Sequence, residues 1–209
     1  MADIVLRAAL LERWRAFSNL LAVRDGAAKG EALVNAYAGP ARRYHGLAHI
    51  AFLLGEIDRH AALIENIAVL QGAAWYHDAV YDPLARDNEE LSAAWARRDL
   101  EGLSCAEPIA TLIEKTKSHH AGDATPDEAL FLDMDFAILG APMEIYAAYA
   151  TAIREEYAAV PDNRFRAGRA SFLGGVLAQP RMFRTDLYEA ERGARARENL
   201  VWEIGRLRA

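Results

Sequence analysis

The adjacent pair His77-Asp78 is the feature that most constrains how this chain of 209 residues can fold. Ile67, Leu70 and Ala74 precede the pair at helical spacing, so both side chains are predicted to point toward the protein interior. A buried carboxylate and a buried imidazole are costly unless a partner neutralises and coordinates them. A divalent metal ion does both, so the sequence predicts that the fold brings further metal ligands to this pair.

The composition argues against several classes of protein. Hydrophobic residues make up 53% of the chain, which argues against disorder, and the net charge of −6 argues against general nucleic-acid binding. The single cysteine, Cys105, leaves neither a disulfide within the chain nor a cysteine-rich zinc site. No apolar run approaches the ~20 residues that span a bilayer. We therefore expect a cytoplasmic protein that does not contact a membrane.

Helix-forming residues dominate the chain and strand-like alternation is nearly absent, so the sequence predicts an all-α fold. Thr125 and Glu128 have the spacing of a capping box, which predicts a helix that begins at Pro126 and runs to about Leu139. Further helices are predicted over residues of about 46–60, over a segment that Asp82-Pro83 ends, and from Asn88 to about Leu103. Breaks are predicted at Gly39-Pro40 and at Gly140-Ala141-Pro142. Pro161 and Pro180 bound a later helix, and the final helix is predicted to begin at Thr185.

Two further histidines precede the pair. His45 and His49 are four residues apart, so we expect them to share one face of a single helix. Phe52 and Leu53 extend that face, which predicts that His49 points inward.

A later helix offers Asp133 and Asp135 as further ligands. Phe131, Met134 and Ile138 define its buried side; Asp135 falls at the edge of that arc and Asp133 more nearly opposite, which favours Asp135. Two imidazoles and two carboxylates suit Mn, Fe, Co, Ni, Zn or Mg. The two carboxylate charges match one divalent cation. Four protein ligands would leave coordination positions open for water in a six-coordinate site.

His49, the pair His77-Asp78 and Asp135 resemble the H…HD…D signature of the HD superfamily of metal-dependent phosphohydrolases. The resemblance implies that these four residues are the metal ligands. The segments that resemble one bacterial branch of predicted HD hydrolases are residues 44–49, 75–82, 87–92 and 131–135.

The same resemblance implies an all-α, HD-domain-like helical bundle that forms a single domain over residues 1–209. Its metal-binding core would occupy residues of about 40–140, with the C-terminal helices packed on it. The expected reaction is hydrolysis of a small phosphorylated substrate, such as a nucleotide, by water that the metal activates. Asp78 and Glu89 are the expected catalytic residues: Glu89 would take a proton from the attacking water, or is an ordinary acid in the first turn of a helix.

Several polar side chains near the motifs are candidates for contacts with the substrate. His45 could instead bind a second metal or lie at the rim of the pocket. His119 and His120 resemble the extra histidines of dinuclear HD enzymes, or are solvated histidines at a helix end. The expected substrate-binding set is His45, Asn88, Lys117, His119 and Arg154.

Two other functions remain open at this point. The extra histidines leave room for an HD-type diiron oxygenase. The pocket could also belong to a non-catalytic module that binds a metal or a nucleotide. The substrate, the identity and number of the metals, and a homodimer are left open by the sequence.

Overall fold

A computed structural model describes residues 2–119 and 122–209, and over these two ranges it contains helices and no β-strand. The predicted all-α fold is therefore confirmed. The chain divides into two compact units, one that runs to Phe131 and one that comprises Leu132–Ala209. The single domain over the whole chain stays a prediction, and each unit is described by itself.

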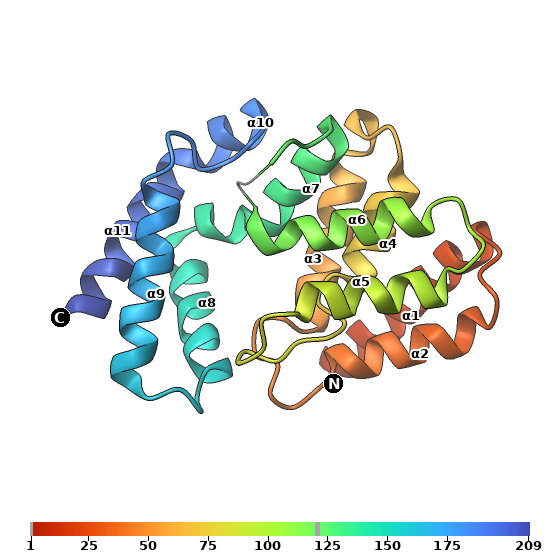
Figure 1. Ribbon diagram of the computed structural model, residues 1–209, viewed down its shortest axis with the longest axis horizontal. Helices are drawn as coiled ribbons and strands as arrows, with labels where there is room; N and C mark the ends of the chain where they lie inside the picture. The colour runs from red at the N-terminus through yellow and green to blue at the C-terminus, as the bar shows by residue number, and fades with distance from the viewer. Residues whose placement is uncertain (1, 120–121) are drawn as a thin grey trace. The chain divides into compact units, whose positions relative to one another are not determined.

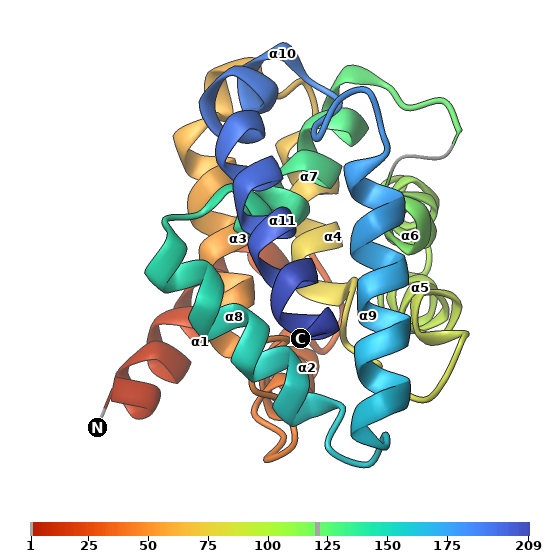
Figure 2. The ribbon, with the colours of Figure 1, turned by 90° about the vertical axis from the view of Figure 1, so that its left-hand side faces the viewer.

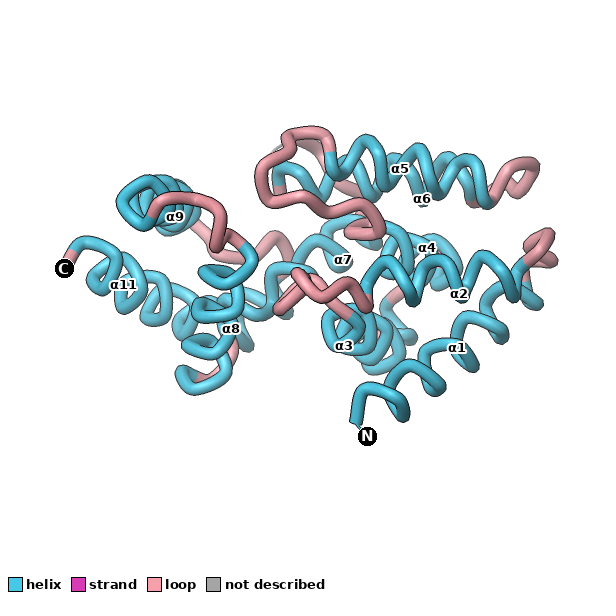
Figure 3. The backbone as a smooth tube through the Cα atoms, turned by 90° about the horizontal axis from the view of Figure 1, so that it is seen from below, coloured by secondary structure: helices cyan, strands magenta, loops and turns pink. Residues whose placement is uncertain are grey.

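Helix α4 lies among three other helices of the first unit, because it packs against α3, α5 and α6 (Figure 1). Most of its side chains are apolar and buried, from Val69 to Tyr76 except Gln71, as is typical of a helix inside a core. Helices α5 and α6 run side by side, as do α1 and α2 (Figure 3). The helices of this unit are α1 (Ala2–Leu20), α2 (Gly26–Tyr37), α3 (Leu47–Arg59), α4 (Ile67–Tyr76), α5 (Asn88–Asp99) and α6 (Ala106–Lys115), with 3-10 turns η1 (Ala61–Leu63) and η2 (Thr116–Ser118).

Trp14 anchors the aromatic part of this core. Its ring packs edge-on against Trp75, with ring centroids 5.3 Å apart, and its Nε1 donates a hydrogen bond of 2.6 Å to the carbonyl oxygen of Gly26. A Cβ atom added to Gly30 would lie 2.2 Å from Cδ1 of Trp14, so α1 and α2 approach closely only because residue 30 is glycine.

The capping box at the start of α7 (Pro126–Phe136) is confirmed. The backbone N–H of Thr125 donates to the Glu128 carboxylate at 2.8 Å, and the N–H of Glu128 donates to the Thr125 hydroxyl at 3.3 Å. Asp127 accepts hydrogen bonds from the N–H groups of Glu65 and Asn66, which fixes the start of α7 to the start of α4. Helix α7 begins in the first unit and ends in the second.

Some predicted boundaries were wrong. Helix α4 ends at Tyr76 rather than at Asp82-Pro83, and α5 ends at Asp99 rather than near Leu103. The hydrogen bond that closes α4 runs from the His77 N–H to the Ala73 carbonyl oxygen. The chain turns after this point. The pair His77-Asp78 therefore lies in the turn that follows a helix.

In the second unit, α9 and α11 pack along each other (Figure 2). Tyr146 of α8 donates to the buried Glu203 carboxylate, which also accepts a 2.8 Å hydrogen bond from Arg169. The final helical region was predicted to begin at Thr185; Thr185 is the N-cap, the helix begins at Asp186, and it contains a π-helical turn. The elements are η3 (Ala137–Gly140), α8 (Met143–Glu156), α9 (Asp162–Leu177), α10 (Asp186–Tyr188), the π-helical turn η4 (Glu189–Gly193) and α11 (Ala194–Arg208).

No single helix within residues 2–119 and 122–209 has both the length and the apolar character needed to cross a membrane. One bent pair, Pro126–Gly140 with Met143–Glu156, meets the length and composition criteria only when the two segments are taken together.

Candidate metal centre

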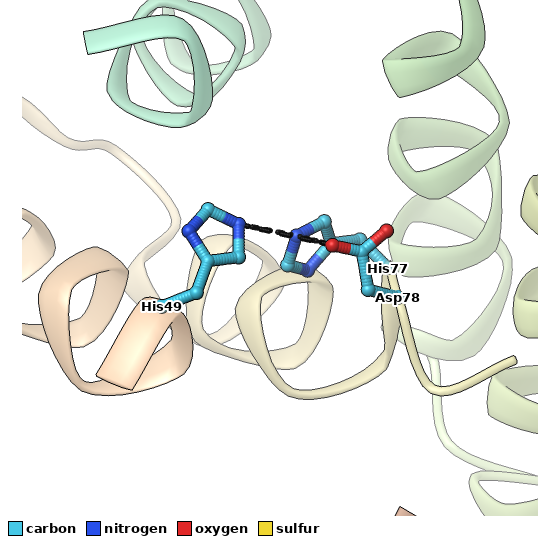
Figure 4. A group of neighbouring side chains, drawn as sticks. All are labelled: His49, His77 and Asp78. Carbon is cyan, nitrogen blue, oxygen red and sulfur yellow. Dashed lines mark hydrogen bonds and ion pairs between the residues drawn. The ribbon is translucent and has the colours of Figure 1, made fainter. Parts of the chain in front are cut away.

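His49, His77 and Asp78 come together inside the first unit, and their side chains point toward one another (Figure 4). His49 lies in the first turn of α3 and is 4% exposed, so the predicted inward direction is confirmed. Phe52, which was expected to extend the buried face, is 37% exposed, whereas Leu53 is fully buried. His77 caps the C-terminus of α4 and is 1% exposed.

The three ligand atoms have the separations that one ion requires. Nε2 of His49 and Nε2 of His77 are 3.1 Å apart, and Oδ2 of Asp78 lies 3.1 Å from the His77 atom and 3.8 Å from the His49 atom. A triangle with these sides has a point about 2.0 Å from all three corners, which matches the roughly 2.0–2.1 Å of zinc–nitrogen bonds. The three residues therefore fit a divalent ion.

A backbone contact sets which nitrogen of His77 faces this point. Nδ1 of His77 lies 3.3 Å from the carbonyl oxygen of Ala74, so the proton on Nδ1 is the one that this acceptor favours. Nε2 then carries a lone pair toward His49. Two imidazole nitrogens this close repel each other unless a proton or a metal cation lies between them.

The Asp78 carboxyl is held in its ionised form. Burial alone would raise its pKa, but His77 above all, followed by His45 and His49, lowers the pKa well below its usual range. A carboxylate and two imidazoles match the donor preferences of zinc and of several first-row transition metals.

The turn that carries the pair is fixed by Arg42 and Tyr37, for which we expected no role at the metal site. The guanidinium of Arg42 donates to the carbonyl oxygens of His45, Asp78 and Ala79 at 3.0, 2.6 and 3.0 Å. The Tyr37 hydroxyl accepts the N–H of Asp78 at 3.1 Å. Only the cationic pair Arg42-Arg43 next to the first motif could have drawn attention to this role.

His45 does not share a helix with His49, and that prediction was wrong. Gly46 is extended at the N-cap, so α3 begins at Leu47 and His45 lies in the preceding turn. The two rings are nevertheless near each other, with centroids 6.0 Å apart, and the His45 ring lies 4.3 Å from that of Tyr81. His45 also lies near enough to Asp78 to lower the pKa of its carboxyl.

Asp133 has an architectural role within the second unit, although we expected it to face away from the buried side of its helix. It is 2% exposed, and it accepts the N–H of Arg184 and both the N–H and the hydroxyl of Thr185, all at 2.6–2.7 Å. Its carboxylate therefore holds a loop of the unit. The assignment of Asp135 as a metal ligand stays a prediction.

The segment after the pair is connected to α5. The Ser92 hydroxyl accepts the N–H of Val80 at 3.1 Å, and the Asn88 side chain bridges the N–H and carbonyl of Asp82. Glu89 lies in the first turn of α5, and Lys117 comes within 4.0 Å of its carboxylate.

The remaining candidates for substrate binding keep that role as a prediction. Lys117 donates to the Glu90 carboxylate and to the Arg86 carbonyl, so its charge is already paired within the first unit. Arg154 donates to the carbonyl oxygens of Tyr157 and Val160 beyond the end of α8, in the second unit.

Of the two adjacent histidines His119 and His120, only the first lies within the described residues. His119 caps the 3-10 turn η2, and His120 lies outside the residues that the structure describes.

No protein-family model matches the chain, and neither a curated protein nor a solved structure matches it. The relation to the HD superfamily therefore remains a resemblance between motifs.

Proposed function

We propose that this protein is a metal-dependent phosphohydrolase that acts on a small phosphorylated molecule, such as a nucleotide. One observation supports the proposal above all: Nε2 of His49, Nε2 of His77 and Oδ2 of Asp78 surround a point at bonding distance from each. Structural zinc sites use four protein ligands, whereas catalytic sites keep positions open. Three or four protein ligands leave such positions in a six-coordinate site.

Asp135 is the proposed fourth ligand. The sequence motif alone carries this choice, because Asp135 lies on α7 in the second unit and the other three residues lie in the first.

The ion, when bound, would polarise a phosphoryl oxygen and lower the pKa of water. In this proposal His49, His77 and Asp78 hold the ion, and Glu89 accepts the proton of the attacking water. His45, Asn88, Lys117, His119 and Arg154 are the side chains proposed to bind and orient the substrate. Cationic groups among them would offset charge that moves to the leaving oxygen.

The test combines elemental analysis of the purified protein with a screen of phosphorylated substrates. His49→Gln and Asp78→Asn are the test variants. His60→Gln is the matched control, because His60 is a buried histidine of the same helix region, at the C-cap of α3, and is outside the cluster.

We expect one divalent ion or more per chain and turnover of a phosphate ester in the wild type and in His60→Gln. His49→Gln and Asp78→Asn should lose both. Hydrolysis that persists in these two variants would overturn the proposal. Tight nucleotide binding without turnover would indicate a binding module, and oxygen consumption by bound iron would indicate an oxygenase.

A further inference from the structure

The turn that carries His77-Asp78 has backbone groups that no helix satisfies. Helix α4 ends at Tyr76, so the carbonyl oxygens of Asp78 and Ala79 lie beyond its hydrogen-bond ladder. Ala79 is 3% exposed, and a buried carbonyl without a donor is costly. The conformation of this turn therefore depends on donors that come from elsewhere in the chain.

Arg42 supplies those donors. Its Nη1 reaches the carbonyl of Asp78 at 2.6 Å and its Nη2 reaches that of Ala79 at 3.0 Å, so the planar guanidinium fork spans two consecutive peptide groups. Nη1 also reaches the carbonyl of His45, at 3.0 Å. One side chain thus ties the turn of the pair to the segment that leads into α3 and His49.

Two aromatic rings restrict the guanidinium further. Its central carbon lies 4.9 Å from the ring centroid of Tyr37 and 5.4 Å from that of Tyr81, within the range of cation–π contacts. The Tyr37 hydroxyl also accepts the N–H of Asp78. Arg42 and Tyr37 therefore fix the peptide groups on both sides of the Asp78 side chain.

We propose that Arg42 is a positioning residue of the metal centre, which it serves by holding the Asp78 carboxylate in register with the two imidazoles. This inference rests on the proposed metal-dependent function. Arg42 itself donates to carbonyl oxygens and offers no ligand atom. Its effect on the ion is transmitted through the backbone of Asp78 and through the segment before His49.

Lysine should not replace Arg42. An ammonium group carries the same charge, but it cannot present two parallel N–H groups to adjacent carbonyl oxygens. Residues that orient metal ligands typically change metal affinity by about 10–100-fold when they are substituted. We expect Arg42→Lys to weaken binding of Co²⁺ within that range.

The experiment measures Co²⁺ binding to the full chain by titration calorimetry and by the visible absorption of the bound ion. Arg197→Lys is the matched control, because Arg197 donates to three carbonyl oxygens in the same way, those of Leu177, Gln179 and Pro180, and is outside the cluster. Thermal unfolding of each metal-free variant reports any general loss of stability.

We expect Arg42→Lys to bind Co²⁺ about 10–100-fold more weakly than the wild type and to alter its absorption spectrum. Arg197→Lys should bind as the wild type does, even where it unfolds at a lower temperature. If Arg42→Lys does not fold, Tyr37→Phe is the variant to measure, because it keeps the ring and removes only the hydroxyl contact to Asp78. We expect Tyr37→Phe also to weaken Co²⁺ binding and to shift the absorption spectrum.

Failure of this inference and failure of the proposed function give different results. Wild-type affinity and spectrum in Arg42→Lys, or in Tyr37→Phe where that variant decides, would overturn this inference and leave the proposed function standing. A wild-type protein that binds neither Co²⁺ nor any other divalent ion would overturn the proposed function, and the role of Arg42 with it.

Discussion

Nδ1 of His77 lies 3.3 Å from the carbonyl oxygen of Ala74, one turn earlier in α4. This contact leaves Nε2, the atom nearest His49, as the nitrogen that can bind an ion. The orientation of the ring is therefore set by the helix that precedes it, before any ion is present.

Binding of an ion should stabilise the folded protein, and substitution of His77 should abolish that effect. A free-ion concentration 100 times the dissociation constant adds about 2.7 kcal/mol. For a chain of this size that raises the midpoint of thermal unfolding by roughly 5–10 °C. His77→Asn keeps an amide near Ala74 but has no ligand atom in the place of Nε2, so its midpoint should not respond to Zn²⁺ or Mn²⁺. His60→Asn should keep the shift; a shift that persists in His77→Asn would contradict the assignment.

Substitution of Asp133 should affect stability, whereas substitution of Asp135 should affect metal affinity. Asp133→Asn replaces an oxygen that accepts hydrogen bonds with an amide that cannot, so we expect a loss of about 1–3 kcal/mol in the free energy of unfolding. Metal affinity should change little. Asp135→Asn should show the reverse, with metal affinity reduced at least tenfold and stability of the metal-free protein retained. Urea unfolding and titration calorimetry measure the two quantities, and an exchange of the two outcomes would make Asp133 the ligand.

The contact between α1 and α2 should not tolerate a methyl group at residue 30. Because the Trp14 ring is buried and hydrogen-bonded, Gly30→Ala should lower the free energy of unfolding by about 1–3 kcal/mol through overpacking. Gly55 on α3 is the matched control, because a Cβ atom there would meet no atom within 4 Å. Gly55→Ala should raise stability by about 0.5–1 kcal/mol, as is usual within a helix. Equal effects at the two positions would contradict this packing.

Glu128 should make stability depend on pH. Burial alone would raise the pKa of its carboxyl, but Lys115 and the N–H of Thr125 lower the pKa below its usual value. An acid with a lowered pKa stabilises the fold above its unfolded-state value of about 4.3, and that contribution disappears as the pH falls through the folded-state value. We expect the wild type to exceed Glu128→Gln by about 0.2–1 kcal/mol at pH 7, in line with other ion pairs near a surface.

Urea unfolding at several pH values checks this expectation. The difference between the two proteins should shrink as the pH falls from about 5 toward 3. Lys115→Gln should remove part of the same pH dependence, because it deletes one partner of the carboxylate and leaves the N–H of Thr125. A difference that is constant with pH would show that the charge of Glu128 is not involved.

The features that the sequence predicted correctly depend on residues close together in the chain. Thr125 and Glu128 form a capping box because both partners lie within one helical turn. His49 points inward because the apolar positions of α3 recur at helical spacing. In both cases the signal lies within one or two helical turns, although Phe52 of the predicted buried face is exposed and Glu128 also pairs with Lys115.

The features that the sequence did not predict depend on distant partners or on a single backbone angle. Asp133 is buried because it binds the backbone of Arg184 and Thr185, more than 50 residues later, and helix periodicity carries no signal for that. His45 lies outside the predicted helix because Gly46 is extended at the N-cap. The early end of α4 depends on Arg42 and Tyr37, whose contacts with the turn span 36 to 41 residues.

The contacts that shape the turn after α4 have a consequence for synthesis of the protein. Arg42, Tyr37, His49 and the pair His77-Asp78 all precede residue 80, so the ribosome produces every one of them before it starts the second unit. Chains generally fold from the N-terminus as they emerge. A nascent chain can thus assemble the three metal-binding groups as soon as the first unit has been made, before the ribosome completes the second unit.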